Sequence, residues 1–113
     1  MKQILSFLDQ LMRHNNREWF IEHKQEYVSA QAHFNEFTEK LIAEVGKFDE
    51  SIRPLTIADC TYRIYKDMRF SREKIPYKTH MGAYLCPHGK KSGMAGYYFH
   101  LEPSESEDYA FGN

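Results

Sequence analysis

Residues 17–47 read REWFIEHKQEYVSAQAHFNEFTEKLIAEVGK, a stretch without proline whose single glycine, Gly46, lies near its end. Apolar side chains recur along it and just beyond it every seven residues, at Phe20, Tyr27, Phe34, Leu41 and Phe48, with Ala30, Phe37 and Val45 on the same side. This pattern predicts one long amphipathic helix, with a break near Ser29 as the alternative, because helices of roughly 45 Å are uncommon in small domains. We expect the apolar stripe to pack in the core rather than against a partner.

A shorter helix precedes this stretch. Apolar residues between Ile4 and Met12 recur at three- and four-residue spacing, which gives one apolar stripe. The basic side chain of Arg13 suits the end of a helix. Either Asn15 or Asn16 can then cap the following helix, because an asparagine oxygen accepts a hydrogen bond from a free N–H of the first turn.

The second half of the chain has the composition of β-strands. Three segments are rich in β-branched and aromatic residues, namely 60–66, 79–86 and 94–101. The proline, glycines and serine of residues 87–93 predict a hairpin connection between the last two segments. Residues 48–59, which include Pro54, predict a loop.

Helices followed by antiparallel strands indicate an α+β fold. We predict two N-terminal helices, the second of them long, packed on a small antiparallel sheet of about three strands. The length of the chain fits a single domain over residues 1–113.

Composition limits the classes of protein to which the chain can belong. Of 113 residues, 42% are hydrophobic and 15% aromatic, and the net charge is −1. These values argue against disorder and against a general affinity for nucleic acid or membranes. Two cysteines, Cys60 and Cys86, are too few for a disulfide-stapled secreted domain, and neither a secretory signal nor a membrane span is visible. We expect a cytoplasmic protein with reduced thiols.

Positive charge is concentrated in one segment. Residues 62–80 have a net charge of +4, whereas residues 1–61 and 81–113 have net charges of −3 and −2. Within that segment the connection Asp67–Lys78 joins the first two predicted strands, and connections of this length are often functional. Guanidinium and ammonium groups suit phosphate or carboxylate ligands. The segment therefore predicts an anion-binding loop, with a solvated surface loop as the alternative.

The alternation of side chains along strands adds to this hypothesis. One face of the predicted sheet is aliphatic and should pack on the long helix, while the other collects Arg63, Tyr65, His80, Tyr84, Tyr98 and His100. The residues that we expect to bind a ligand are Arg63, Tyr65, Arg69, Ser71, Lys74, Tyr77, Lys78 and Tyr98. His80 and His100 are candidates for proton transfer. The sequence leaves open whether the protein is an enzyme.

Other functions have weaker support in the sequence. Cys86 and His88, with His80 or His100, offer three metal ligands, but no established metal-binding motif is present, and we expect no metal and no cofactor. Binding of single-stranded nucleic acid is disfavoured by the pI of 6.6. The remaining alternative is a structural or protein-interaction module, including assembly with a second copy of the chain.

Four blocks of the sequence, in order, resemble a known family. They are Asn15–Phe20, Tyr62–Ser71, Lys74–His80 and Gly96–Leu101. The family is domain of unknown function family 2461, a group of uncharacterised, mostly bacterial proteins, and the resemblance covers nearly all of residues 4–103. It implies a fold and motif positions but no reaction. Longer members continue beyond the last block, so the resemblance implies that this chain is an N-terminal half whose bare strand edge favours self-association.

Overall fold

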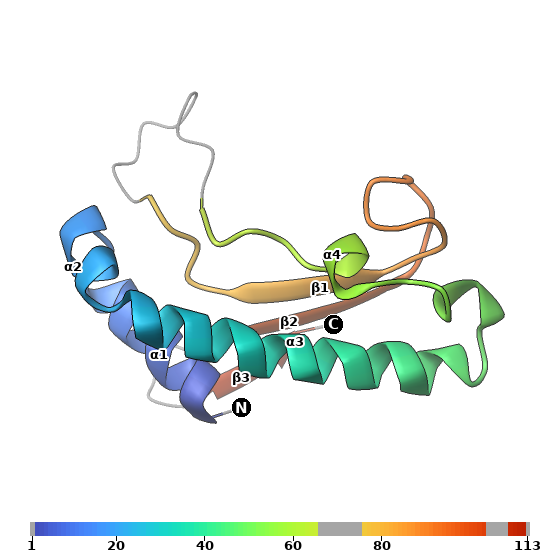
Figure 1. The fold of residues 1–113 in the computed structure, drawn as a ribbon, viewed down its shortest axis with the longest axis horizontal. Coiled ribbons are helices and arrows are strands. Elements are labelled where there is room, and N and C mark those ends of the chain that lie inside the picture. The colour runs from blue at the N-terminus through green and yellow to red at the C-terminus, as the bar shows by residue number, and fades with distance from the viewer. Residues whose placement is uncertain (1, 66–75, 104–108, 113) are drawn as a thin grey trace.

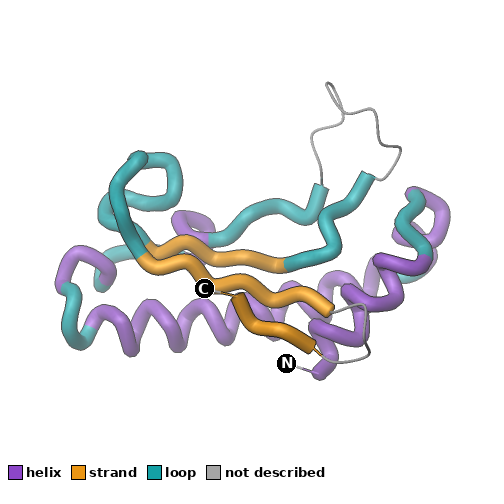
Figure 2. The backbone as a smooth tube through the Cα atoms, turned by 180° about the vertical axis from the view of Figure 1, so that it is seen from behind, coloured by secondary structure: helices purple, strands orange, loops and turns teal. Residues whose placement is uncertain are grey.

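Helices and an antiparallel sheet form two layers in the computed structural model, which describes residues 2–65, 76–103 and 109–112 (Figure 1). The elements in chain order are α1 (Lys2–Arg13), α2 (Arg17–Glu22), α3 (Lys24–Gly46), η1 (Glu50–Ile52), α4 (Ile57–Cys60), β1 (Met81–Leu85), β2 (Tyr97–Pro103) and β3 (Tyr109–Gly112). The strands lie in the order β1-β2-β3, and both pairs are antiparallel. In Figure 2 the three strands lie beside one another and α3 runs along one side of the sheet. The protein is therefore α+β, as the sequence predicts.

Helix α1 is the predicted first helix. Its apolar stripe is buried and consists of Ile4, Leu5, Phe7, Leu8 and Leu11. Arg13 lies in the last turn, where it pairs with Asp9 at 3.3 Å. Among the described residues, no helix combines the length and the apolar character that crossing a bilayer requires.

The predicted long helix is divided at His23, not near Ser29. At this residue φ is −110° and ψ is 20°, and the His23 N–H is shared between the carbonyls of Trp19 and Phe20, at 3.0 and 3.2 Å. The His23 ring stacks on Trp19 with centroids 4.1 Å apart, and its Nδ1 lies 2.8 Å from the Trp19 carbonyl oxygen. The Trp19 carbonyl thus lies close to both the N–H and the ring of His23. These contacts mark the division between α2 and α3, at a position that hydrophobic spacing does not mark.

Helix α3 buries a stripe that differs from the seven-residue one. Its buried side chains include Ala30, Phe34, Thr38, Ile42 and Val45. A straight α-helix drifts by about 20° per heptad from a seven-residue repeat, so a strict heptad leaves the buried face after a few turns. The predicted core packing is confirmed for Phe20 and Phe34, which are buried. It is wrong for Phe48, which follows the end of the helix and is 71% exposed.

Strands β1 and β2 form the predicted antiparallel pair, and their register separates two faces. Met81, Ala83 and Leu85 oppose Leu101, Phe99 and Tyr97, respectively. These side chains belong to the core or pack against it, together with those of α1 and α3. Gly82 and Tyr84 oppose His100 and Tyr98 on the outer face of the sheet. The alternation predicted for these two strands is therefore confirmed.

The prediction of a strand over residues 60–66 is wrong. The chain there leaves α4 and makes two isolated bridges, from Thr61 to Ala83 and from Tyr65 to Tyr77. Thr61 and Tyr65 are four positions apart, whereas their partners are six positions apart, so the two segments cannot keep one register between the bridges. The strand on the other side of β2 is β3, from a segment to which the sequence analysis assigned no strand.

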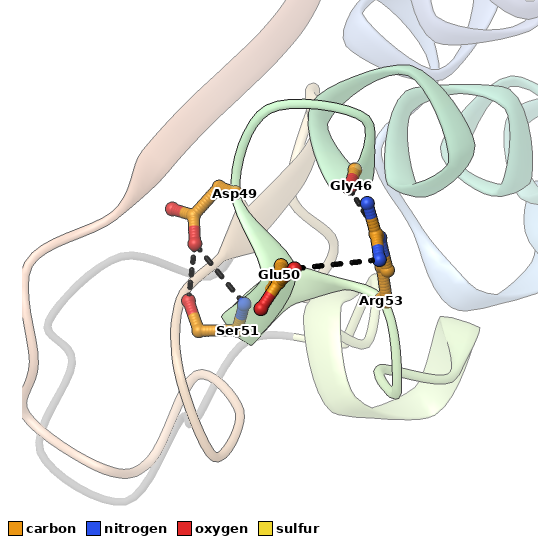
Figure 3. Close-up of polar contacts among 5 residues, drawn as sticks. All are labelled: Gly46, Asp49, Glu50, Ser51 and Arg53. Atoms are coloured by element: carbon orange, nitrogen blue, oxygen red, sulfur yellow. Dashed lines mark hydrogen bonds and ion pairs between the residues drawn. The ribbon is translucent and has the colours of Figure 1, made fainter.

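The connection after α3, predicted as a loop, contains the short helices η1 and α4. Figure 3 shows the contacts that close the end of α3. The Asp49 carboxylate accepts hydrogen bonds from the Ser51 hydroxyl at 2.6 Å and the Ser51 N–H at 3.1 Å, which lowers the pKa of Asp49. Arg53 Nε donates to the Gly46 carbonyl at 2.6 Å. The Tyr97 hydroxyl donates to the second Asp49 oxygen at 3.1 Å, which ties this turn to the start of β2.

Asn15 and Asn16 have different roles. Asn16 caps α2, because its Oδ1 accepts a hydrogen bond from the Trp19 N–H at 2.8 Å. Asn15 binds the backbone of Tyr77 with both ends of its amide: Nδ2 donates to the Tyr77 carbonyl at 2.9 Å, and Oδ1 accepts from the Tyr77 N–H at 3.1 Å. Tyr77 is 4% exposed and stacks on Phe20, with centroids 4.1 Å apart. The turn between α1 and α2 thus fixes the chain at Tyr77.

We predict that Asn15→Ala destabilises the protein by about 1–3 kcal/mol, because it leaves the N–H and carbonyl of Tyr77 without their partner in a half-buried position. Urea unfolding followed by circular dichroism measures the loss. The control is Asn35→Ala in α3, where Asn35 only accepts a hydrogen bond from Gln31 on the same helix. Equal stability of the Asn15 variant and the wild type would contradict this role.

Both cysteines are free and buried. Burial, followed by the charge of the neighbouring Asp59, raises the pKa of the Cys60 thiol to about 11. Cys86 Sγ donates to the carbonyl of Gly89 at 2.8 Å in the connection between β1 and β2. Both side chains therefore act as packed thiols in the core.

We predict that neither thiol of the native protein reacts appreciably with an aromatic disulfide reagent at pH 8, and that both react at once in denaturant. The folded state favours the protonated Cys60 thiol, because the pKa of this thiol is raised in the fold. The thiol therefore contributes to stability at pH values below the ordinary thiol pKa of about 8.5, and this contribution is lost as the pH rises above that value. The release of the coloured thiolate measures the reaction. Rapid labelling of the native protein at either cysteine would contradict the assignment.

Candidate functional site

The outer face of the β1–β2 pair carries tyrosine and histidine side chains. Tyr98 lies over Gly82 of the neighbouring strand: a Cβ at Gly82 would be 2.9 Å from the Tyr98 hydroxyl and 3.3 Å from its Cε1. The Tyr98 hydroxyl is hydrogen bonded to His100 Nδ1 at 2.8 Å. Tyr84, opposite Tyr98, donates its hydroxyl to the Met94 carbonyl at 2.7 Å. The absence of a side chain at Gly82 therefore allows Tyr98 to reach and orient His100.

A cluster of two imidazoles and one carboxylate extends from this contact. His80 directly precedes β1 and stacks on His100, with ring centroids 4.6 Å apart. His100 Nε2 lies 3.1 Å from Glu102 Oε1. One ligand atom from each of His80, His100 and Glu102 lies within 4.8 Å of the others. The side chains are accessible, because that of His100 is 19% exposed and that of Glu102 is 48% exposed.

Two ammonium groups approach the ring of Tyr62. Lys78 Nζ lies 5.7 Å from the ring centroid and Lys90 Nζ lies 5.8 Å from it. Lys90 also donates to the Ala58 carbonyl at 2.6 Å. Burial lowers the pKa of Lys78, and burial together with the nearby Tyr98 raises the pKa of Tyr62. Lys78 is thus a partly desolvated cation on an aromatic ring.

Three predicted site residues form a separate group near α2. Arg63 lies over the ring of Tyr65 at 5.7 Å, and Tyr65 contacts both Phe20 and Tyr77 with centroids 5.9 and 5.8 Å apart. Tyr77 belongs to the core. The alternation predicted for residues 60–66 fails because this segment is not a continuous strand. Tyr65 contacts Phe20 and Arg63 lies over Tyr65, while Tyr62 is the residue beside Lys78.

The structure thus brings together only part of the predicted site. Lys78, His80, Tyr98 and His100 surround the outer face of the sheet or its margin. Arg69, Ser71 and Lys74 lie outside the described residues.

Sequence reasoning missed Glu102, Gly82 and Tyr62. Glu102 shares a strand face with Tyr98 and His100 because β2 continues to Pro103, two residues beyond the predicted strand end. The sequence analysis ended the strand at Leu101, so it did not extend the alternation of Tyr98 and His100 to Glu102. No local signal in the sequence marks Gly82 or Tyr62, since the roles of both depend on residues far away in the sequence.

A groove of about 680 Å³ lies away from this face. It is lined by residues of α1, α3 and the break between α2 and α3, among them Phe7, Gln10, His23 and Glu26. None of its lining residues belongs to the sheet, so it does not coincide with the predicted site.

A comparison with known protein families matches residues 3–112 to DUF2461, described as a conserved hypothetical protein. The chain belongs to the DUF2461 family. The match extends through β3, so the expectation that this chain is only the N-terminal half of a member is not borne out. Searches of curated proteins and of solved structures found no significant match. Membership of the DUF2461 family assigns no activity, and the function must be argued from the site.

We predict that Gly82→Val breaks the contact between Tyr98 and His100, because a branched side chain at this position collides with the Tyr98 ring. The imidazole ¹⁵N chemical shifts of His100 should change in the same direction in Gly82→Val and in Tyr98→Phe, which removes the hydroxyl directly. Tyr84→Phe is the matched control, since the Tyr84 hydroxyl binds Met94 and should leave His100 unaffected. Unchanged His100 shifts in the first two variants would refute this arrangement.

Proposed function

We propose that the DUF2461 protein binds a small ligand bearing a carboxylate or phosphate group at the Lys78 end of the outer sheet face. The observation that carries this proposal is the environment of Lys78. Its ammonium group is half-buried on Tyr62, and no ion pair between described residues includes it. A cation that has lost part of its hydration gains more from a bound anion than a fully hydrated one.

Charge in the surrounding sequence supports the same location. Residues 62–80 carry a net charge of +4 in a chain whose net charge is −1. Glu102, which follows Tyr98 and His100 on the same strand face, is engaged with His100. Among the ion pairs of the described residues, Glu102 is paired with His100 and not with Lys78, so Lys78 can attract an anion.

Tyrosine and histidine side chains supply the polar groups that would orient such a ligand. Tyr62 is exposed and lies beside Lys78. The Tyr98 hydroxyl and the His100 imidazole form a connected pair that can donate or accept. An aromatic wall with a few convergent polar groups is typical of small-molecule sites. Proton transfer by His80 or His100 would extend this binding function to catalysis, and we propose binding alone.

The test is a titration of the full chain with inorganic phosphate and with acetate, followed by calorimetry and by amide chemical shifts. We predict saturable binding that Lys78→Met weakens about 10- to 100-fold, because a charge-assisted hydrogen bond contributes about 1.5–3 kcal/mol. Lys91→Met, at an exposed lysine of the β1–β2 connection, is the matched control and should bind as the wild type does.

Two outcomes would overturn the proposal. One is the absence of saturable binding of either anion to the wild type. The other is an equal loss of binding in the Lys78 and Lys91 variants, which would indicate nonspecific attraction. Circular dichroism of each variant verifies that the fold is retained.

A further inference from the structure

We propose that His80, His100 and Glu102 form a site for one divalent transition-metal ion, with Zn²⁺ as the preferred ion. This site adjoins the proposed anion site and shares Tyr98 and His100 with it, but it does not depend on anion binding. The sequence analysis expected no metal, because no established metal-binding motif is present, and its candidate ligands, Cys86 and His88 with His80 or His100, did not include Glu102. Cys86 is instead buried and bonded to Gly89, whereas the three residues proposed here face one another on the outer side of the sheet.

The distances fit a single ion. At metal–ligand distances of about 2.0–2.2 Å, two ligands of a tetrahedral ion lie roughly 3.4 Å apart. His100 Nε2 and Glu102 Oε1 are already 3.1 Å apart. All three ligand atoms lie within 4.8 Å of one another, so closure around an ion requires only side-chain adjustments of His80 and Glu102.

The backbone places two of the three residues on β2 and the third, His80, directly before the neighbouring strand β1. His100 and Glu102 are two positions apart on β2, so both side chains leave the same face of the sheet. The pair Met81–Leu101 is the last of the β1–β2 ladder, and one further step along that register brings His80 opposite Glu102. The ligands are thus carried by paired strands rather than by a long loop, which favours a defined geometry.

Tyr98 supplies the second contact that a metal-binding histidine usually has. In such sites the other ring nitrogen is hydrogen bonded, which fixes the tautomer and the orientation of the ring. His100 Nδ1 is hydrogen bonded to the Tyr98 hydroxyl at 2.8 Å, and Nε2 faces Glu102. When Nδ1–H donates to the Tyr98 oxygen, the lone pair of Nε2 is directed to the position between His100 and Glu102 that an ion would take.

The donor set indicates the class of metal. Two imidazole nitrogens and one carboxylate oxygen suit Zn²⁺ and other first-row divalent ions, whereas Ca²⁺ and Mg²⁺ prefer oxygen ligands alone. Three protein ligands leave at least one coordination position for water or for a ligand. The partial exposure of His100 and Glu102 gives the ion a path from solvent.

The test uses the full chain, freed of metal with a chelator and then titrated with Zn²⁺ by calorimetry and with Co²⁺ by visible absorption. We predict one ion per chain and the intense visible bands of four- or five-coordinate Co²⁺. His80→Ala, His100→Ala and the near-isosteric Glu102→Gln should each weaken binding at least tenfold. Tyr98→Phe should weaken it to a smaller extent, because it removes only the orienting hydroxyl.

The controls are His33→Ala and His88→Ala, at exposed histidines outside the cluster, which should bind the ion as tightly as the wild type. Circular dichroism verifies that every variant folds.

Failure of the wild type to bind one Zn²⁺ or Co²⁺ would overturn the proposal, as would an unchanged affinity in Glu102→Gln and His100→Ala. A thiolate-to-cobalt charge-transfer band would also overturn it, since it would place the ion on the cysteines. Phosphate binding is measured separately without metal, so either proposal can fail alone.

Discussion

The register between β1 and β2 is the constraint on which the rest of the arrangement depends. Ala83, Leu85 and Leu101 are buried in the core that α1 and α3 complete. Because successive side chains of a strand point to opposite faces, burial of this set turns Tyr98 and His100 outward. A shift by one residue would bury the imidazole and expose the leucines. The hydrophobic core therefore determines where the polar face can form.

The elements that the sequence predicts correctly are those whose signal is local and periodic. The stripe of α1 and the alternation along β1 and β2 both follow from burial of one face. The division between α2 and α3 was not predictable in this way, because it depends on contacts of the His23 ring with Trp19. The segment 60–66 has a strand-like composition, but its pairing is limited to one bridge with β1 and one with Tyr77. Composition alone cannot reveal a mismatch of spacing between two segments.

The candidate site shows the same division between local and nonlocal information. Tyr98 and His100 were predictable because they alternate along one strand, and Lys78 because it belongs to a basic segment. The position of Tyr77 was not, since its burial depends on Phe20 and on the amide of Asn15, more than sixty residues earlier in the chain. Gly82 was also missed, because a residue that acts by having no side chain is recognised only once the neighbour that fills its space is known.

The β-bridge between Tyr65 and Tyr77 affects how the chain can vary between these two residues. The two residues form a β-bridge, and Tyr77 is also held by Asn15, so the chain leaves and returns at adjacent, fixed points. The entropic cost of closing such a connection grows slowly, by about 0.6 kcal/mol for each doubling of its length. The scaffold can therefore accept connections of different length and composition at this place without rebuilding its core.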